Sequence, residues 1–245
     1  MQYILNADDF GRTETVNEAI VYGFEHHYLD RTSIMVNMPY FEEAVTLSEQ
    51  HGFKDKVGLH INLTSGIPLT EPIKTVNTFC GENGCFNGRI FKDRRMMLIL
   101  SHREKKAVKL EVEAQIKKYL DYGFTLMHAD SHGHVHTFPS MQSSIITCIS
   151  KSKFQSVRIS ANLHSNCLMK FRKKIQNRKL LNYNQNQALS VEFFDSLKNI
   201  FAVLNLLNPI EGQCEIMLHP NIWGGDIQIG EGLHYEDLMN LRRLR

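Results

Sequence analysis

Polar residues that could bind a metal or move a proton stand directly after several short apolar runs of this chain. Asp8 and Asp9 follow residues 3–7, and His60 follows residues 57–59. The residues at the ends of the later runs are His128, Asp130, His132, Arg158 and His219. Parallel strands of an α/β fold end at one edge of the sheet, where active sites lie. If the runs are such strands, the pattern predicts a single active site and therefore an enzyme.

The adjacent carboxylates of Asp8 and Asp9 form the first part of this predicted site. A carboxylate beside an apolar core needs a cation or hydrogen-bond donors. Neighbouring residues at a strand end point in different directions, so one aspartate can bind a metal while the other faces a substrate. The alternative is that one of them caps the helix expected just beyond Gly11. Capping accounts for one aspartate but not readily for both.

Histidines are concentrated in one short segment. Four histidines and an aspartate fall within nine residues, whereas the whole chain has 12 histidines among 245 residues. These five residues are His128, Asp130, His132, His134 and His136. A lone histidine beside apolar residues, such as His60, is more often a hydrogen-bonded core residue than a metal ligand. The local density reverses that interpretation and predicts a metal site.

A set of one aspartate and two histidines predicts a catalytic metal, because it leaves coordination positions for water and substrate. Such a metal polarises a carbonyl group and lowers the pKa of bound water, while a nearby carboxylate takes the proton. Hydrolysis is the reaction that follows. His219, fixed by Pro220, is a candidate acid for the leaving group. Arg158 is a candidate to orient an aspartate or stabilise negative charge, although a surface ion pair explains it equally well.

Composition argues against several other classes of protein. The net charge of +2 favours neither nucleic acid nor a membrane as a partner, so we expect a small neutral substrate. The first residues lack the basic start of a secretory signal, and no window approaches the ~20 apolar residues of a membrane span. We therefore expect a cytoplasmic protein. Its five cysteines, which include no CxxC pair, are expected to be reduced thiols. The basic run at 170–179 is typical of a solvated helix face or loop.

Periodicity predicts alternating strands and helices, which implies parallel strands. After the first strand, further strands are expected at 32–36, 56–63, 124–130, 156–159 and 215–218. The expected helices are 13–26, 40–51, 103–122, 139–150, 191–207 and 235–244. Residues 64–92 predict a long loop of the kind that forms a lid or wall. The count predicts one α/β domain over residues 1–245, a (β/α) barrel with seven strands, and no glycine loop for nucleotides is present.

Three motifs resemble the signatures of the YdjC-like carbohydrate deacetylases, the family that includes chitooligosaccharide deacetylase. They are Asn6-Ala7-Asp8-Asp9-Phe10-Gly11, Gly58-Leu59-His60-Ile61-Asn62-Leu63-Thr64 and His128-Ala129-Asp130-Ser131-His132-Gly133-His134-Val135-His136. The resemblance implies a divergent (β/α) barrel related to polysaccharide deacetylases. It also implies a divalent metal, removal of an N-acetyl group from an amino sugar or short chitooligosaccharide, and often a homodimer.

The same resemblance implies a role for each candidate residue. The metal ligands would be Asp9, His60 and His132. Asp8 would be the general base, His219 the general acid and Arg158 the residue that holds the base. Asp130, His134 and His136 would line or support the site. The family resemblance implies magnesium, but imidazole ligands suit zinc, cobalt or manganese at least as well, so the metal stays open.

Two alternative functions remain at this stage. His134 and His136 could be the HxH pair of an amidohydrolase or metal-dependent phosphoesterase barrel. Against this, the pair lies in the middle of the chain, and the first strand carries an aspartate pair. The other alternative is a sugar-binding barrel that has lost turnover, which the complete set of candidate catalytic residues argues against.

Overall fold

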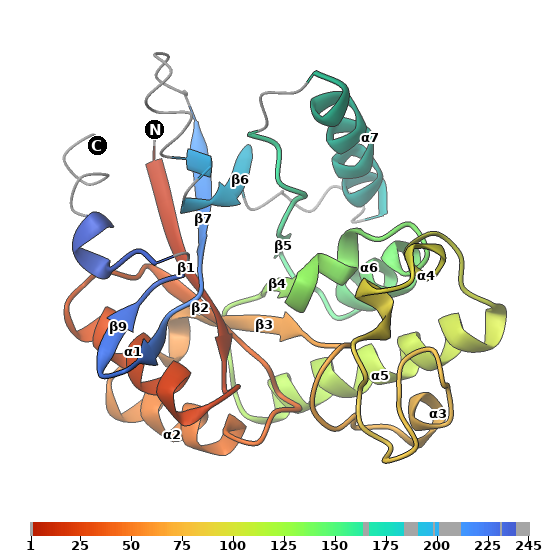
Figure 1. Cartoon of the computed structure of the whole chain (residues 1–245), viewed down its shortest axis with the longest axis horizontal. Coiled ribbons are helices and arrows are strands. Elements are labelled where there is room, and N and C mark those ends of the chain that lie inside the picture. Colours follow the sequence, from red (N-terminus) through yellow and green to blue (C-terminus); the bar gives the residue numbers. More distant parts are fainter. Residues whose placement is uncertain are drawn as a thin grey trace.

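The computed structural model describes residues 2–163, 167–183, 191–197, 199–200, 212–230 and 232–238, and in this part of the chain seven parallel strands form one curled sheet (Figure 1). The strands are β1 (Gln2–Phe10), β2 (Arg31–Ile34), β3 (Val57–Ile61), β4 (His128–Ser131), β5 (Ser156–Val157), β6 (Phe193–Ser196) and β7 (Gln213–Leu218). Their order in the sheet is β5-β4-β3-β2-β1-β7-β6.

This order is that of a barrel with one interruption, between β5 and β6. Strands β1 to β5 follow one another in sequence, while β7 and β6 continue from the other side of β1. The interruption is bridged by Asn162, whose backbone N–H donates to the carbonyl oxygen of Phe194 over 3.2 Å. The side-chain oxygen of Asn162 in turn accepts from the N–H of Phe194 over 3.1 Å. The predicted divergent, seven-stranded (β/α) barrel is confirmed.

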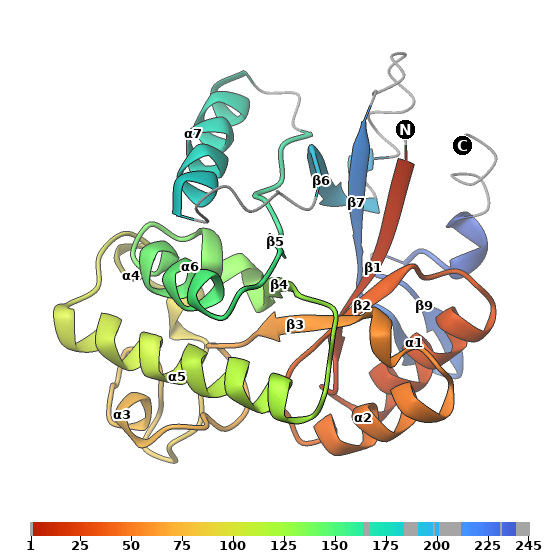
Figure 2. The ribbon, with the colours of Figure 1, turned by 180° about the vertical axis from the view of Figure 1, so that it is seen from behind.

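Helices cover the outside of the sheet. The α-helices are α1 (Glu14–Glu25), α2 (Phe41–Gln50), α3 (Glu71–Lys74), α4 (Arg94–Leu98), α5 (His102–Asp121), α6 (Gln142–Lys151) and α7 (Cys167–Tyr183). The 3₁₀ segments are η1 (Lys54–Lys56), η2 (Arg89–Phe91), η3 (His132–Thr137) and η4 (Tyr235–Asp237). In both views α5 and α6 lie side by side, with α1 and α2 on the opposite flank (Figure 2). A short hairpin, β8 (Asn221–Trp223) and β9 (Asp226–Gln228), contacts α1.

The alternation of side chains along β1 separates the core from the barrel interior. Leu5 and Ala7 belong to the apolar core under the helices and are fully buried. Asn6 and Asp8 point to the opposite face, where both are also buried. Burial of each large apolar side chain contributes about 1.5–3 kcal/mol, so the outer layer stabilises the barrel. The interior of the barrel is therefore free to carry polar residues.

The prediction of a helix over 191–207 is wrong at its beginning. Residues 193–196 form β6, whose Phe193 and Phe194 pair with Cys214 and Glu215 of β7. Pairing with an existing parallel strand outweighs the weak local preference for helix in this segment. Residues 201–207 lie outside the described part of the chain.

Other differences concern lengths and short elements. The expected loop 64–92 contains α3 and η2, and its apolar side chains Ile73, Phe79 and Ile90 are buried in the core. Strand β4 begins only at residue 128, four residues later than predicted, and β5 is two residues long. The described start of the expected helix 235–244 is the 3₁₀ turn η4, and residues 239–244 lie outside the described part. The basic run of 170–179 lies on α7.

Cys80, Cys85, Cys148 and Cys214 are free thiols, while the side chain of Cys167 lies outside the described part. In the described residues, no helix combines the length and apolar character that crossing a membrane requires.

Candidate metal centre and catalytic cluster

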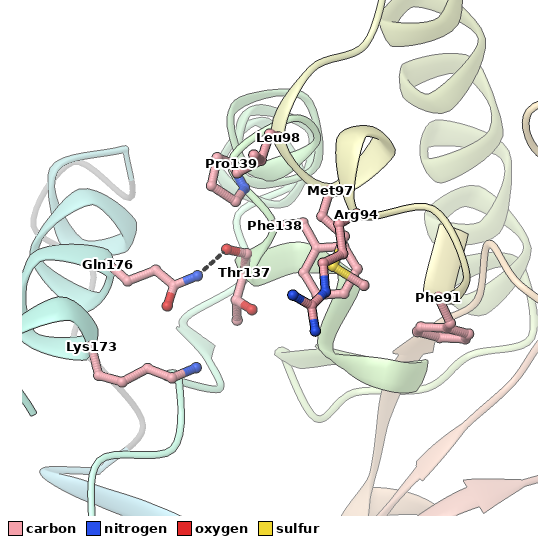
Figure 3. Close-up of a pocket in the computed structure, with 9 residues that line it drawn as sticks. All are labelled: Phe91, Arg94, Met97, Leu98, Thr137, Phe138, Pro139, Lys173 and Gln176. Atoms are coloured by element: carbon pink, nitrogen blue, oxygen red, sulfur yellow. Dashed lines mark hydrogen bonds between the residues drawn. The ribbon is translucent and has the colours of Figure 1, made fainter. Parts of the chain in front are cut away.

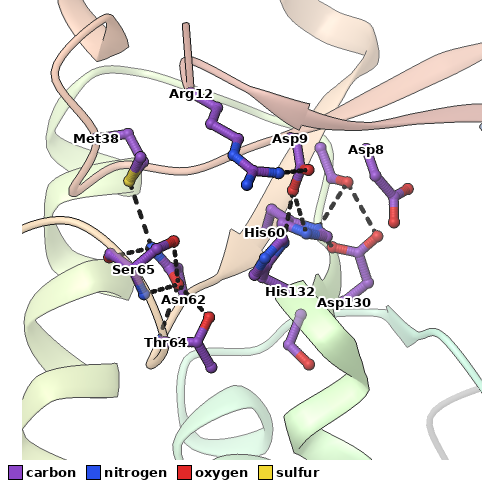
Figure 4. Close-up of polar contacts among 12 residues, drawn as sticks. Asp8, Asp9, Arg12, Met38, His60, Asn62, Thr64, Ser65, Asp130 and His132 are labelled. Atoms are coloured by element: carbon purple, nitrogen blue, oxygen red, sulfur yellow. Dashed lines mark hydrogen bonds and ion pairs between the residues drawn. The ribbon is translucent and has the colours of Figure 1, made fainter. Parts of the chain in front are cut away.

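Asp9, His60 and His132 meet at the C-terminal ends of β1, β3 and β4 (Figure 4). The Oδ1 atom of Asp9 lies 2.7 Å from Nδ1 of His132 and 3.3 Å from Nε2 of His60. One ligand atom from each residue falls within 4.8 Å of the other two. The strand ends predicted to share one edge therefore bring these three side chains together.

His60 is held in place from behind by Asp130. Its Nδ1–H donates to Oδ1 of Asp130 over 2.6 Å, and the hydroxyl of Ser33 donates to Oδ2 of the same carboxylate over 2.9 Å. This hydrogen bond fixes the tautomer that leaves Nε2 of His60 as an acceptor. That Nε2 atom is buried, faces Asp9 and has no hydrogen-bond partner among the described residues. A carboxylate behind an imidazole with a free inner nitrogen is the usual support of a metal-binding histidine.

Arg158 binds the carboxylate of Asp8. The two terminal nitrogens of the guanidinium donate to the two carboxylate oxygens of Asp8, each over 2.6 Å. Asn6 adds a hydrogen bond of 2.8 Å to Oδ1. Arg158 also contacts Oδ2 of Asp130 at 2.6 Å. This one buried cation therefore binds the carboxylates of both Asp8 and Asp130. Arg158 is thus a buried residue, and the surface ion pair considered from the sequence is ruled out.

Glu215 is a member of this cluster that sequence reasoning did not identify. It lies fully buried on β7, accepts from Nε of Arg158 over 2.6 Å and forms an ion pair with Arg31 at 2.5 Å. Arg31 also donates from Nε to the amide oxygen of Asn6 over 3.0 Å. The sequence contains a pattern that could have identified it. A glutamate beside the apolar residues 216–218 requires a buried cation, just as the aspartates do.

The backbone of β1 changes course at the site. The register with β2 shifts between Ala7 and Phe10, which indicates a bulge, and Asp9 has φ of 69°. A left-handed conformation costs a residue with a side chain about 1–2 kcal/mol. The bulge interrupts the alternation of β1, so that both Asp8 and Asp9 face the same cluster. Arg12, which is partly exposed, donates to Oδ2 of Asp9 over 2.7 Å and stabilises this arrangement.

The loop after β4 orients the remaining histidines. Gly133 and His134 adopt left-handed conformations with φ of 59° and 56°, which turn the chain sharply after His132. His136 is buried, with Nδ1 on the hydroxyl of Ser131 at 2.5 Å and Nε2 donating to the carbonyl of Arg158 over 2.9 Å. Both of its ring nitrogens are therefore occupied. His136 supports the site, and the HxH pair considered as an alternative does not present two free nitrogens to a metal.

The buried cluster contains more carboxylates than arginines. Four buried carboxylates, those of Asp8, Asp9, Asp130 and Glu215, surround the buried cation Arg158 and the mostly buried Arg31. Although burial disfavours the charged imidazolium, the neighbouring Asp130 raises the pKa of His60 to about 10. Burial likewise disfavours ionised Asp9, yet the hydrogen bond from His132 and the nearby imidazole of His60 hold its pKa well below the usual value. A cation placed among these groups would relieve the same imbalance without a proton on His60.

The chemistry of the donors fits a divalent metal ion. One carboxylate and two imidazoles are suitable ligands, the orphaned Nε2 of His60 faces the carboxylate, and Asp130 supplies the outer support. His132 is partly exposed, which leaves an approach for water and substrate from the rim. The cluster thus resembles an open catalytic site more than a closed structural one.

Comparison with known proteins agrees with this geometry. The family model described as YdjC-like protein matches residues 2–236. The chain belongs to the YdjC-like family. It is 34% identical over 226 residues to a carbohydrate deacetylase of Thermoanaerobacter pseudethanolicus, covering 90% of this chain and 81% of that protein. It is 30% identical to a carbohydrate deacetylase of Clostridium beijerinckii, covering 100% of this chain and 91% of the relative.

A solved structure shares the fold. An Enterococcus faecalis protein assigned to cellobiose-phosphate cleavage superposes with a TM-score of 0.66 at 22% identity, covering 91% of this chain and 82% of its own. At this level of identity, the likeness concerns the barrel alone.

In the described part of this YdjC-like chain, the contacts that build the cluster do not include His219. It follows β7, whose Leu218 pairs with Ala7, so His219 stands at the same edge of the barrel as Asp8. It is exposed, and its backbone N–H donates to the carbonyl of Ile229 over 2.9 Å. No hydrogen bond joins its side chain to the cluster among the described residues. The rings of His134 and Phe194 meet edge to face, with 5.5 Å between their centroids. The Nδ1 atom of His134 is buried and has no hydrogen-bond partner in the described part of the chain.

Proposed function

We propose that this protein is a metal-dependent carbohydrate deacetylase that removes an N-acetyl group from an amino sugar or short chitooligosaccharide. Its relatives in the YdjC-like family carry the name carbohydrate deacetylase at 30–38% identity. The observation that carries the metal dependence is the buried, unpartnered Nε2 of His60, which faces the carboxylate of Asp9 beside His132. These three residues would hold one divalent ion.

Such an ion, when bound, polarises the acetyl carbonyl and lowers the pKa of the attacking water. Asp8 lies beside the ligand set, and its carboxylate retains lone pairs beyond those used by Arg158 and Asn6. In the proposed reaction Asp8 accepts the proton of the water. Arg158 keeps that carboxylate in one orientation through two parallel N–H donors, which is the strongest geometry available for a carboxylate.

His219 is the proposed donor of a proton to the leaving amine. Its place at the end of β7 puts it at the edge where β1 carries Asp8, and its exposure leaves it accessible to a substrate entering from solvent. Acid and base would then approach the amide from different strands, as general acid–base catalysis requires. The metal itself stays open, with magnesium implied by family resemblance and zinc, cobalt or manganese suited to imidazole ligands.

Acetate release from a panel of N-acetylated mono- and disaccharides tests the proposal. The protein is stripped of metal and then reloaded with magnesium, zinc, cobalt or manganese. We expect acetate only with metal and only from amino sugars. Folded, metal-loaded protein that releases no acetate from any sugar contradicts the proposal, and release of phosphate from sugar phosphates would favour the phosphoesterase alternative. Assembly as a homodimer stays a prediction that light scattering can check.

A further inference from the structure

The two carboxylate oxygens of Asp9 have different partners. Oδ1 lies 2.7 Å from Nδ1 of His132 and 3.3 Å from Nε2 of His60, so this oxygen belongs to the proposed metal centre. Oδ2 instead accepts from a terminal nitrogen of Arg12 over 2.7 Å (Figure 4). A carboxylate binds a metal ion through one oxygen or through both. Because Arg12 holds Oδ2, the arrangement leaves Oδ1 as the ligand atom of Asp9.

The backbone around Arg12 is fixed independently of this side-chain contact. The N–H of Arg12 donates to the carbonyl oxygen of Asp9 over 3.1 Å, which closes a turn between β1 and α1. On either side of Arg12, Gly11 donates its N–H to the side chain of Asn17 over 2.8 Å, and Thr13 caps α1. The turn therefore presents residue 12 to Asp9 before any metal binds. The side chain of Arg12 can be replaced without loss of these bonds.

Arg12 covers Asp9 from the solvent side. Its side chain is 41% exposed, whereas that of Asp9 is 6% exposed. Two of the three proposed ligands thus have an outer partner, a guanidinium on Asp9 and the carboxylate of Asp130 on His60. Outer partners of this kind orient a ligand and tune its metal. An ion pair with an exposed partner contributes little to stability, so the main effect of this contact falls on Asp9.

We propose that Arg12 is a positioning residue that restricts Asp9 to metal ligation through one oxygen and thereby sets the preference among divalent ions. This inference rests on the metal dependence in the proposed function. Zinc is bound most often by four ligands, whereas manganese favours six and suits carboxylate oxygens. Withholding Oδ2 therefore disfavours manganese relative to zinc. Without Arg12, the site regains an oxygen ligand and shifts toward manganese.

Direct metal binding measures this preference without turnover. The full-length protein is treated with a chelator and titrated calorimetrically with Mn²⁺ and, separately, with Zn²⁺. The ratio of the two dissociation constants is then compared between the parent and its variants. We expect Arg12→Met to shift this ratio about tenfold toward manganese. Arg12→Lys should keep the parent ratio, because Arg12 gives Asp9 a single nitrogen that an ammonium group can replace.

The visible absorption of bound Co²⁺ reports the number of ligands independently. Cobalt with four or five ligands absorbs visible light more strongly than cobalt with six. The Arg12→Met protein should therefore absorb more weakly per bound cobalt than the parent and than the Arg12→Lys protein. An unchanged ratio of dissociation constants or an unchanged cobalt spectrum in Arg12→Met overturns the inference. Urea denaturation verifies that each variant is folded.

Two other arginines control for the loss of a positive charge. Arg95 is 90% exposed and lies 3.2 Å from Asp93, so Arg95→Met breaks another arginine–aspartate pair. Arg94 lines a cavity of about 660 Å³ between α4, η3 and α7, and none of the proposed ligands belongs to its described lining (Figure 3). Arg95→Met and Arg94→Met should leave the ratio unchanged, because a lost charge affects two divalent ions equally. A shift in either control as large as that in Arg12→Met overturns the inference.

Acetate release separates this inference from the proposed function. Metal-dependent acetate release, with an affinity ratio that Arg12→Met leaves unchanged, supports the deacetylase and overturns the role of Arg12. A ratio that shifts in Arg12→Met, without acetate from any N-acetylated sugar, supports the role of Arg12 and overturns the deacetylase. Folded protein that binds neither Mn²⁺ nor Zn²⁺ overturns both.

Discussion

Arg158 inside the barrel and Arg94 at the cavity wall carry the same guanidinium group in opposite settings. Arg158 is completely buried and contacts Asp8, Asp130 and Glu215, each at 2.6 Å. Arg94 is exposed and has no ion pair within the described part of the chain. One arginine already has its partners in the folded protein, while the other is exposed to solvent.

This difference between the two arginines indicates that the two regions have different roles. Inside the barrel, the charges are fixed before any substrate arrives, as an active site needs if its groups are not to reorganise during the reaction. At the surface, a solvated cation such as that of Arg94 costs little in the folded protein. We expect substitutions inside the barrel to change stability and turnover, and substitution of the exposed Arg94 to leave stability nearly unchanged.

The largest effect should come from Arg158→Met. The substitution leaves three buried carboxylates without their shared cation, which costs about 3–5 kcal/mol when one partner of a buried pair is removed. The free energy of unfolding, measured by urea denaturation, should fall by that amount, and activity should be lost. Arg94→Met provides the comparison and should change the free energy of unfolding by less than about 0.5 kcal/mol. Equal effects of the two substitutions would refute the contrast between the regions.

Asp8→Asn and His132→Ala should separate the proposed base from the proposed metal ligands. Asp8→Asn should keep the metal and lower kcat by about 10²–10⁴-fold, the usual contribution of a general base. His132→Ala should lose metal and activity together. Metal content from inductively coupled plasma spectrometry and acetate release are measured on the same samples. Full activity in both variants would exclude this cluster as the active site.

Acidification should destabilise the interior through its neutral histidines. Burial lowers the pKa of His128 to about 3 and that of His136 to about 4, from 6.5 for an ordinary histidine. At pH values between about 4 and 6.5, the unfolded chain binds more protons than the folded protein. The free energy of unfolding therefore falls as the pH drops below about 6.5. Each histidine should cost about 2 kcal/mol between pH 7 and pH 5.

His136→Gln tests this pH dependence, because glutamine does not titrate. Urea denaturation of the variant should show a smaller loss of stability between pH 7 and pH 5 than the parent protein shows. His102→Gln, at an exposed position, is the control and should leave the pH dependence unchanged. An unaltered slope in His136→Gln would mean that His136 does not carry the effect.

The smallest effect within the barrel should come from Glu215→Gln. Glutamine retains an acceptor for Arg158 and Arg31 but removes a buried charge, which should cost about 1–3 kcal/mol of stability. If Glu215 positions Arg158 on Asp8, kcat should fall about tenfold or more while KM changes little. A loss of stability with unchanged kcat would assign Glu215 a structural role alone. Cys214→Ser, next along the strand, controls for disturbance of β7.

Much of the fold was predictable from local pattern. Alternating apolar runs and helical periodicity predict β1 to β5, β7 and the helices α1, α2, α5 and α6. The error at Phe193–Ser196 arose because the segment's strand conformation depends on pairing with β7, a partner later in the chain. The packing of the β8–β9 hairpin against α1 also depends on such a distant contact.

Residue types and their spacing along the chain show which side chains could act: an aspartate pair, strand-end histidines and an arginine, at positions where buried polar groups require partners. The identity of those partners depends on the three-dimensional packing. It placed Arg158 on Asp8 from 150 residues away, identified Glu215, and occupied both nitrogens of His136. It also built a cavity between α4, η3 and α7. The reason is physical: residue type and spacing fix a side chain's chemistry and its strand, but hydrogen-bond partners a few ångströms apart depend on how distant strands pack.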